Sequence, residues 1–276
     1  MDTYSFADFI KYGKYSSIAD LFSYAKSNNL VDILNYYCKK YKIKFPIIYQ
    51  RAYDNTKFLS MNRFEKLKKF LKTLNDNKIN YYIIKGPSIS KYLYDDLFER
   101  LYSDIDIIVS ACDYIKLHKC LTKNGFHNAY INNSIPRRSI LQFSFNIRGE
   151  DIIYSKNVNN FEIGFEIRDT IRLLNLKQMD NFNKHIERCT YGGFAFNQLD
   201  LHYTIVLQII YAYNAYFTEY GVVNNYKIKY IIELYMLLNK YSFIQMNEIK
   251  QIFSNLKLNY MYNSIIKVYN LLFIDS

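Results

Sequence analysis

The order of patterns along the chain predicts an α+β protein, in which a small mixed sheet with helices is flanked by helical regions at both ends. Three observations lead to this prediction. Apolar residues first recur at helical spacing, strand-like alternation then appears, and helical spacing returns from about Leu199 to the C-terminus. We therefore expect an N-terminal helical region over 1–75, a mixed core over 76–176 and a C-terminal helical region over 177–276.

The N-terminal region shows the spacing of an amphipathic helix. Its clearest stretch places apolar residues three or four positions apart, with lysines mostly between them. These apolar residues are Phe64, Leu67, Phe70, Leu71 and Leu74. The polar run 75–77 then interrupts the pattern, so we place the border of the core there.

The first core elements follow directly. A short apolar run, Tyr81–Ile84, predicts a strand that ends at Lys85-Gly86-Pro87, and a helix is expected from near Ser88. Asp104–Val109 alternates acidic and aliphatic residues, as a half-buried strand does. The two strands thus enclose one short helix.

The rest of the core contains one segment with helical spacing and two segments with strand-like alternation. Ile115 and Leu121 share one face of a predicted helix, which Asn124-Gly125 closes. Two later segments alternate apolar and polar residues and predict further strands, Leu141–Ile147 and Phe161–Ile167. The sheet is therefore expected to lie entirely within the middle third of the chain.

Charge and cysteine content indicate the compartment and the kinds of partner to expect. The net charge is +11, and residues 1–80 hold 15 Lys and Arg against 7 Asp and Glu, an excess of +8. Since these lysines alternate with apolar residues, we interpret most of them as a solvated helical surface. The cysteines form no CxxC pair, and we find no secretory leader or membrane span. We expect a cytoplasmic protein with free thiols and no membrane partner.

The chemistry is concentrated in two acidic segments. Asp104 and Asp106 alternate with isoleucines, so one strand face carries both carboxylates about 7 Å apart. On the segment Phe161–Ile167, Glu162 and Glu166 are equally placed on the polar face. Carboxylates from two adjacent strands can bind two divalent cations for phosphoryl transfer. The alternative is that Asp104 and Asp106 form a solvated strand face.

A phosphate-binding turn is expected beside these acids. The strand that ends at Lys85-Gly86 leads into a helix at Ser88, where backbone N–H groups and a hydroxyl can hold phosphate oxygens. Arg100 precedes Asp104 by four residues and could face the same site. Lys85 could equally be an ordinary surface lysine.

Together these motifs resemble a known family. The strings YIIKGPSI at 82–89 and RLYSDIDIIV at 100–109, with NGF at 124–126 and FEIR at 165–168, are similar to a family of uncharacterised bacterial nucleotidyltransferases. That family lies within the polymerase-beta-like nucleotidyltransferase superfamily. The resemblance covers roughly residues 62–240 and implies that the mixed core is a polymerase-beta-like nucleotidyltransferase core.

The resemblance implies a reaction and its acidic residues. A nucleotidyltransferase moves an NMP from an NTP, expected here to be ATP, to an acceptor and releases pyrophosphate. Asp104 and Asp106 would hold two Mg²⁺ ions. Glu166, rather than Glu162, would complete the metal site and help to deprotonate the acceptor hydroxyl. The family has a histidine where this chain has Arg168, which cannot act as a base at neutral pH.

The resemblance also implies a nucleotide-binding turn. Gly86 and Ser88 would lie against the β- and γ-phosphates, and Lys85 and Arg100 would give electrostatic support. The superfamily usually has Gly or Ser after the glycine, whereas this chain has Pro87. Because proline has no N–H, the phosphates would depend more on Ser88 and on later amides.

The acceptor stays open at this point. A small molecule or peptide fits the near-neutral middle of the chain and is the acceptor we favour. An RNA acceptor, as in nucleotidyltransferase toxins that modify tRNA, would use the N-terminal lysines; these are Lys39, Lys40, Lys42, Lys44, Lys66, Lys68, Lys69 and Lys72. A protein AMP-transferase and a non-catalytic nucleotide-binding module are also compatible with these motifs.

Overall fold

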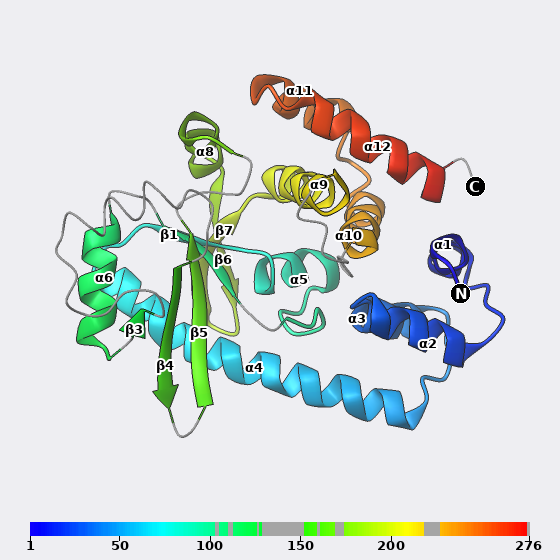
Figure 1. Cartoon of the computed structure of the whole chain (residues 1–276), viewed down its shortest axis with the longest axis horizontal. Helices are drawn as coiled ribbons and strands as arrows, with labels where there is room; N and C mark the ends of the chain where they lie inside the picture. The colour runs from blue at the N-terminus through cyan, green and yellow to red at the C-terminus, as the bar shows by residue number, and fades with distance from the viewer. Residues whose placement is uncertain are drawn as a thin grey trace. The chain divides into compact units, whose positions relative to one another are not determined.

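The computed structural model of the chain shows a mixed α+β protein (Figure 1). It describes residues 1–102, 105–109, 113–125, 127–128, 152–158, 161–168, 174–217 and 227–274. The order of elements confirms the predicted α+β class, with helices at both ends of the chain and strands between them.

The chain forms two compact units, and each is assembled from separate segments. The helical unit comprises Met1–Lys57, Tyr92–Arg100 and Leu201–Ser276. The sheet unit comprises Phe58–Lys91 and Leu101–Asp200. These units do not follow the linear borders expected at 75 and 176, because the sheet unit begins at Phe58 and ends at Asp200. The segment Tyr92–Arg100 in addition belongs with both ends of the chain.

The N-terminal part is helical, as the periodicity predicts, and is divided into four helices. They are α1 (Thr3–Tyr12), α2 (Ile18–Ser27), α3 (Val31–Lys40) and α4 (Ile47–Asp76). Helix α1 begins where the Asp2 carboxylate accepts a hydrogen bond from the Ser5 N–H. It ends at Gly13, whose φ of 70° suits a left-handed helix cap.

The C-terminal part of the helical unit is built around one apolar helix. Its members are α9 (Leu201–Phe217), α10 (Lys227–Lys240), α11 (Met246–Asn255) and α12 (Asn259–Phe273). Helix α9 packs against the other three, which explains why most of its residues are buried. No helix in the described part of the chain is both long and apolar enough to cross a membrane.

The sheet unit contains a seven-stranded mixed sheet in the order β3-β4-β5-β2-β1-β7-β6. Its strands are β1 (Tyr81–Ile84), β2 (Asp106–Val109), β3 (His127–Asn128), β4 (Ile152–Val158), β5 (Phe161–Arg168), β6 (Ile186–Tyr191) and β7 (Phe194–Leu199). In the part of this unit that the structure describes, the sheet is accompanied by α5 (Pro87–Tyr94), α6 (Tyr114–Lys123), α8 (Leu176–Asn183) and the part of α4 from Phe58 onward. The pairs β1–β7 and β2–β5 are parallel and the others antiparallel.

The central strands lie close to where the sequence predicts them, but one of them is more deeply buried than expected. Strand β1 has the predicted bounds, whereas β2 begins two residues later than expected, at Asp106. All four residues of β2 are buried, so this strand is not half-buried as the alternation suggested. It lies between β1 and β5 in the middle of the sheet. The strand predicted at Leu141–Ile147 lies outside the described residues.

The hairpin β6–β7 is a correction to the predicted helical region over 177–276. Gly192 and Gly193 connect the two strands with φ values of 55° and 76°, the left-handed backbone that a tight hairpin requires. Two adjacent glycines between short apolar runs are a hairpin signal that the sequence does contain. Strand β6 has little apolar alternation because it is an exposed edge strand.

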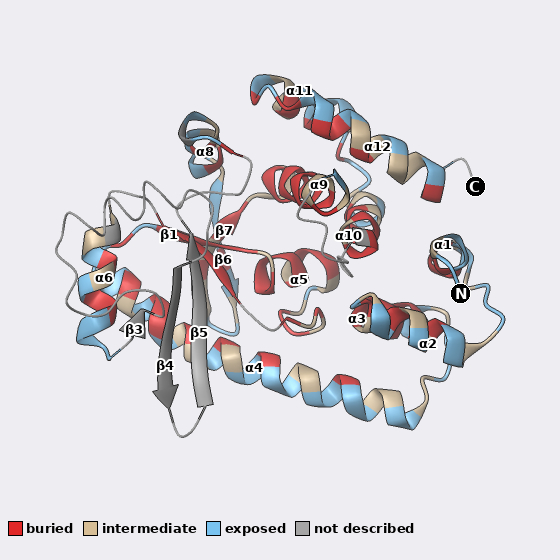
Figure 2. Cartoon of the chain, in the orientation of Figure 1, coloured by how far each residue is buried: buried red, intermediate tan, exposed pale blue. Residues whose placement is uncertain are grey.

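The core of the sheet unit includes the apolar face of α4. The residues at its helical spacing are buried, as predicted (Figure 2). The Phe64 ring meets the rings of Phe194 and Phe196 on β7, each with a centroid separation of 6.1 Å. The Phe64 ring thus packs helix α4 against β7, the strand next to β1.

Candidate functional site

The end of β1 and the start of β2 lie side by side and bring predicted site residues together. We call this place, where the central strands end, the edge of the sheet. Strands β1 and β2 are antiparallel, and Ile84 at the end of β1 pairs with Asp106 at the start of β2. The turn that begins at Lys85 therefore starts beside Asp106, although 21 residues separate them along the chain. This juxtaposition follows from the antiparallel register alone.

The register of β5 adds a second acidic position. Strands β2 and β5 are parallel, and Asp106 pairs with Glu166. Glu162 pairs instead with Asn157 on β4, four residues further back along β5. Of the two glutamates that the alternation left equivalent, Glu166 is thus at the same level of the sheet as Asp106.

The turn after β1 has an unusual backbone. Lys85 and Gly86 both have positive φ, 57° and 44°. This region is open to glycine but costs other L-residues roughly 1–2 kcal/mol. Pro87 then opens helix α5, a position where a proline is favoured because its missing N–H has no helical partner. The departure at Pro87 from the family pattern is thus compatible with the local fold.

Backbone hydrogen bonds already use part of the expected phosphate-binding turn. The Ser88 N–H donates to the Lys85 carbonyl at 3.0 Å, and the Ser90 N–H donates to the Gly86 carbonyl at 3.1 Å. Ser88 itself is 2% exposed. The turn is therefore closely packed around Gly86 and Ser88.

An ion pair joins the turn to the acidic edge. The Lys85 ammonium lies 3.2 Å from Asp106 Oδ1. The Asp106 side chain is 2% exposed and the Lys85 side chain 20%. A buried carboxylate without a cation is strongly unfavourable, so Lys85 supplies the charge that the interior of the sheet requires. The structure thus brings together Lys85, Gly86, Asp106 and the Glu166 position.

Two further site residues lie partly or wholly outside the described structure. Asp104 is outside the described residues, and Glu166 is described only by its place in the strand. Within the described residues, no three His, Cys, Asp or Glu side chains are grouped closely enough to hold a metal ion. Asp106 is thus the acidic side chain of the site whose contacts are visible.

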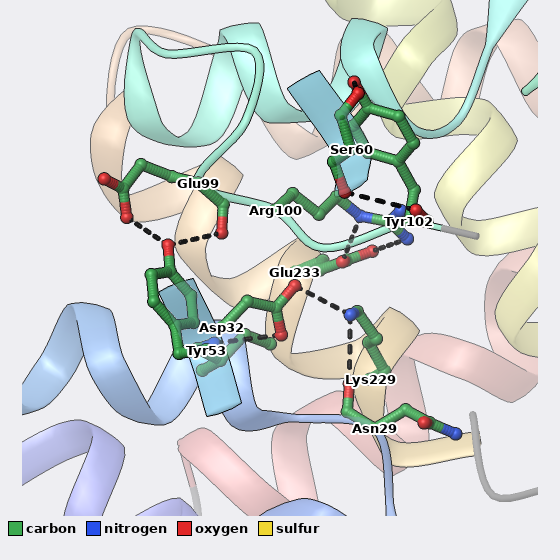
Figure 3. A network of polar contacts seen from close by, with 10 residues as sticks. Asn29, Asp32, Tyr53, Ser60, Glu99, Arg100, Tyr102, Lys229 and Glu233 are labelled. Carbon is green, nitrogen blue, oxygen red and sulfur yellow. Dashed lines mark hydrogen bonds and ion pairs between the residues drawn. The ribbon is translucent and has the colours of Figure 1, made fainter. Parts of the chain in front are cut away.

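Arg100 lies in the helical unit, where it has an acidic partner. Its guanidinium donates from Nε to Glu233 Oε1 at 2.7 Å and from Nη2 to Glu233 Oε2 at 3.4 Å (Figure 3). Both side chains are buried, 9% and 0% exposed. Burial alone lowers the pKa of Arg100, but the Glu233 carboxylate outweighs this effect and raises it. The position of Arg100 is therefore that of a structural ion pair.

A second buried pair in the helical unit was not expected. The Lys229 side chain is only 4% exposed, and its ammonium lies 2.8 Å from Asp32 Oδ2. The ammonium also donates to the Asn29 carbonyl at 3.0 Å (Figure 3). No local pattern indicates this pair, because 197 residues separate its members.

The segment Tyr92–Arg100 is anchored within the helical unit by several polar contacts. The Tyr53 hydroxyl donates to Glu99 Oε2 at 2.5 Å, and the Lys57 ammonium donates to Glu99 Oε1 at 2.7 Å. The Lys240 ammonium donates to Asp95 Oδ2 at 2.6 Å. These contacts hold the stretch of chain that leads from α5 toward Asp104 and Asp106.

The fold and site together define a mixed α+β protein whose central strands carry acidic residues beside a glycine-containing turn. The chain belongs to a family of nucleotidyltransferases described as uncharacterised, whose model matches residues 24–273. This confirms the predicted nucleotidyltransferase family.

The chain was also compared with curated proteins and with solved structures. No curated protein matches the sequence. Among solved structures, the chain is similar to an antigenic nucleotidyltransferase-like protein from Paracoccidioides brasiliensis. The two share 12% identity with a TM-score of 0.41, and the match covers 78% of this chain and 93% of that one.

Proposed function

We propose that the protein transfers an NMP from an NTP, with ATP as the donor, to an acceptor and releases pyrophosphate. The observation that supports this most is the pairing of Asp106 with Glu166 at the level where the Lys85-Gly86 turn begins. Membership of the nucleotidyltransferase family supports the same reaction class. A non-catalytic nucleotide-binding module would have no need for acidic residues on two paired strands.

The residues at this edge suit Mg²⁺. Carboxylate oxygens are the protein ligands that Mg²⁺ uses, together with phosphates and water. The Lys85 ammonium lies 3.2 Å from Asp106 Oδ1, so this oxygen already has a positively charged neighbour, which supports a role in cation binding. Asp104, Asp106 and Glu166 would hold two ions, which when bound would neutralise phosphate charge and polarise the α-phosphate.

The chain's own residues would orient the reactants. The acceptor hydroxyl oxygen forms a bond to the α-phosphorus, and the bond from that phosphorus to the bridging oxygen breaks, so that pyrophosphate leaves. The carboxylate of Glu166 would take the hydroxyl proton. Gly86 and Ser88 would lie near the β- and γ-phosphates, where the left-handed backbone of Gly86 allows a close approach. We leave Arg100 out of this site because Glu233 occupies its guanidinium.

A small molecule or peptide is the acceptor we propose. The lysines of α4 alternate with buried apolar residues, as on an ordinary amphipathic helix. Lys68 pairs with Glu65 at 2.6 Å, and Lys39 lies 3.5 Å from Glu99. A lysine-rich face that contains its own acids is a poor counterpart for RNA phosphates. Labelled NTP incubated with small-molecule, peptide and RNA fractions would identify the acceptor by mass spectrometry.

The substitution Asp106→Asn tests the reaction itself. It keeps the shape of the side chain and removes one charge, so transfer from labelled ATP should fall by about 10³ or more. Asp180→Asn, the same change at an exposed position of α8 in the sheet unit, is the matched control and should retain full activity. Turnover of Asp106→Asn within about threefold of the unchanged protein would contradict the proposed site.

A further inference from the structure

The ion pair between Lys85 and Asp106 is unevenly buried. The carboxylate is enclosed, at 2% exposure, whereas the Lys85 side chain is 20% exposed. The side chain of lysine is long and flexible and carries a point charge at its tip. The ammonium can therefore move toward solvent while Asp106 stays within the sheet.

The same carboxylate oxygen has two competing uses. In the proposed function Asp106 binds a divalent cation, whose distance to an oxygen ligand is about 2.0–2.1 Å for Mg²⁺. The Lys85 ammonium already lies 3.2 Å from Asp106 Oδ1. Two cations this close repel each other strongly in a buried setting. A metal ion can thus occupy this oxygen only when Lys85 moves away.

The backbone at Lys85 is strained. Its φ of 57° is uncommon for a residue with a side chain, and strained backbone is characteristic of functional sites. Lys85 is also the residue directly before Gly86, which the proposed function places near the β- and γ-phosphates. An ammonium released from Asp106 would thus be close to new anionic partners when a triphosphate is present.

We propose that Lys85 is the resident counter-ion of Asp106 and makes the site select metal bound to a nucleoside triphosphate over metal alone. This inference rests on the proposed function. Free metal must displace the ammonium without compensation, whereas the metal–triphosphate complex supplies phosphate oxygens that accept it. Lys85 therefore couples the binding of the metal to the binding of the nucleotide.

Mn²⁺ binding measured by electron paramagnetic resonance tests the coupling without any turnover. The probes are Mn²⁺ alone and Mn²⁺ with the non-hydrolysable α,β-methylene analogue of ATP. In the unchanged protein the analogue should tighten Mn²⁺ binding by at least about tenfold. In Lys85→Met, Mn²⁺ alone should bind at least about tenfold more tightly, and the analogue should add little.

Two variants serve as matched controls. Lys91→Met makes the same change on α5, where the Lys91 ammonium lies over the Tyr191 ring at 6.0 Å, and should leave both affinities unchanged. Lys85→Arg keeps the positive charge and should keep Mn²⁺ binding weak in the absence of nucleotide. Asp106→Asn should weaken Mn²⁺ binding under both conditions.

The outcomes separate this inference from the function on which it rests. If the unchanged protein binds Mn²⁺ equally well with and without the analogue, the coupling role of Lys85 is wrong, and this result needs no variant to fold. Unchanged or weaker binding of Mn²⁺ alone by folded Lys85→Met is equally contrary. If the unchanged protein and both Lys85 variants bind no Mn²⁺ even with the analogue, the proposed function itself fails.

Discussion

The helical unit and the sheet unit bury charge in different ways. In the helical unit both members of each buried pair are covered, with side chains 9% and 0% exposed for Arg100–Glu233 and 4% and 1% for Lys229–Asp32. In the sheet unit only the acid is covered, because the Lys85 side chain remains 20% exposed. All three pairs neutralise a buried carboxylate.

This difference distinguishes a fixed ion pair from an exchangeable one. A pair with both members buried cannot open without leaving a charge in the interior, so it acts as a structural link. A pair with one solvent-reaching member can exchange that member for another cation. We therefore expect substitutions in the helical unit to change stability first, and substitutions at the sheet edge to change ligand binding and transfer first.

The largest expected effect belongs to Glu166 in the sheet unit. Glu166→Gln should lower transfer by about three orders of magnitude, because the reaction would lose a carboxylate at the level of Asp106. The midpoint of thermal unfolding should stay nearly constant. Transfer assays and calorimetry on the same preparation would measure both quantities.

Glu162→Gln is the control on the same strand. Its register partner is Asn157 on β4 rather than a residue of β2, so transfer should be close to that of the unchanged protein. If Glu162→Gln abolished transfer and Glu166→Gln did not, the assignment of the third carboxylate would be reversed.

The next effect is on the stability of the helical unit. Glu233→Gln should lower the free energy of unfolding by about 3–5 kcal/mol, because it leaves the Arg100 guanidinium buried without its carboxylate. Urea denaturation would measure this loss. Glu248→Gln, at an exposed position of α11, is the matched control and should have little effect.

A double variant sharpens the interpretation. Combining Glu233→Met with Arg100→Met removes both charges, and apolar side chains often replace a buried pair at little cost. We expect the double variant to be more stable than Glu233→Gln alone. A double variant that is less stable still would show that the pair contributes more than charge neutralisation.

The smallest expected effect is at an exposed pair of the helical unit. The Lys240 ammonium lies 2.6 Å from Asp95 Oδ2, but the Asp95 side chain is 71% exposed. Asp95→Asn should therefore change the free energy of unfolding by about 0–1 kcal/mol, and less at high salt. A loss comparable to that of Glu233→Gln would remove the distinction between buried and exposed pairs.

The sequence predicted local elements well where one periodicity dominates. Strand β1 has the expected bounds, and the apolar stripe of α4 is buried as its spacing predicts. The hairpin β6–β7 was missed because its edge strand is mostly exposed and has no apolar face to detect. Burial of Asp106 was also missed, since alternation alone does not show that both faces of β2 are covered.

The candidate site was predictable to the extent that it is local in sequence. The turn at Lys85 and the acid at Asp106 come together through a simple antiparallel pair. Arg100 lies close to Asp104 in sequence, but its partner Glu233 is 133 residues away. Proximity along the chain suggested a shared site, but it does not show the ion pair of Arg100 with Glu233, because no periodicity encodes a contact between residues so far apart.

The segment Tyr92–Arg100 affects how the two units could be exchanged by recombination between genes. The chain passes from one unit to the other after Lys57, Lys91, Arg100 and Asp200. Neither unit corresponds to one uninterrupted stretch of coding sequence, so a single recombination event cannot exchange one unit and leave the other whole. A continuous stretch of coding sequence that includes both Lys85 and Asp106 therefore always includes this segment of the helical unit as well.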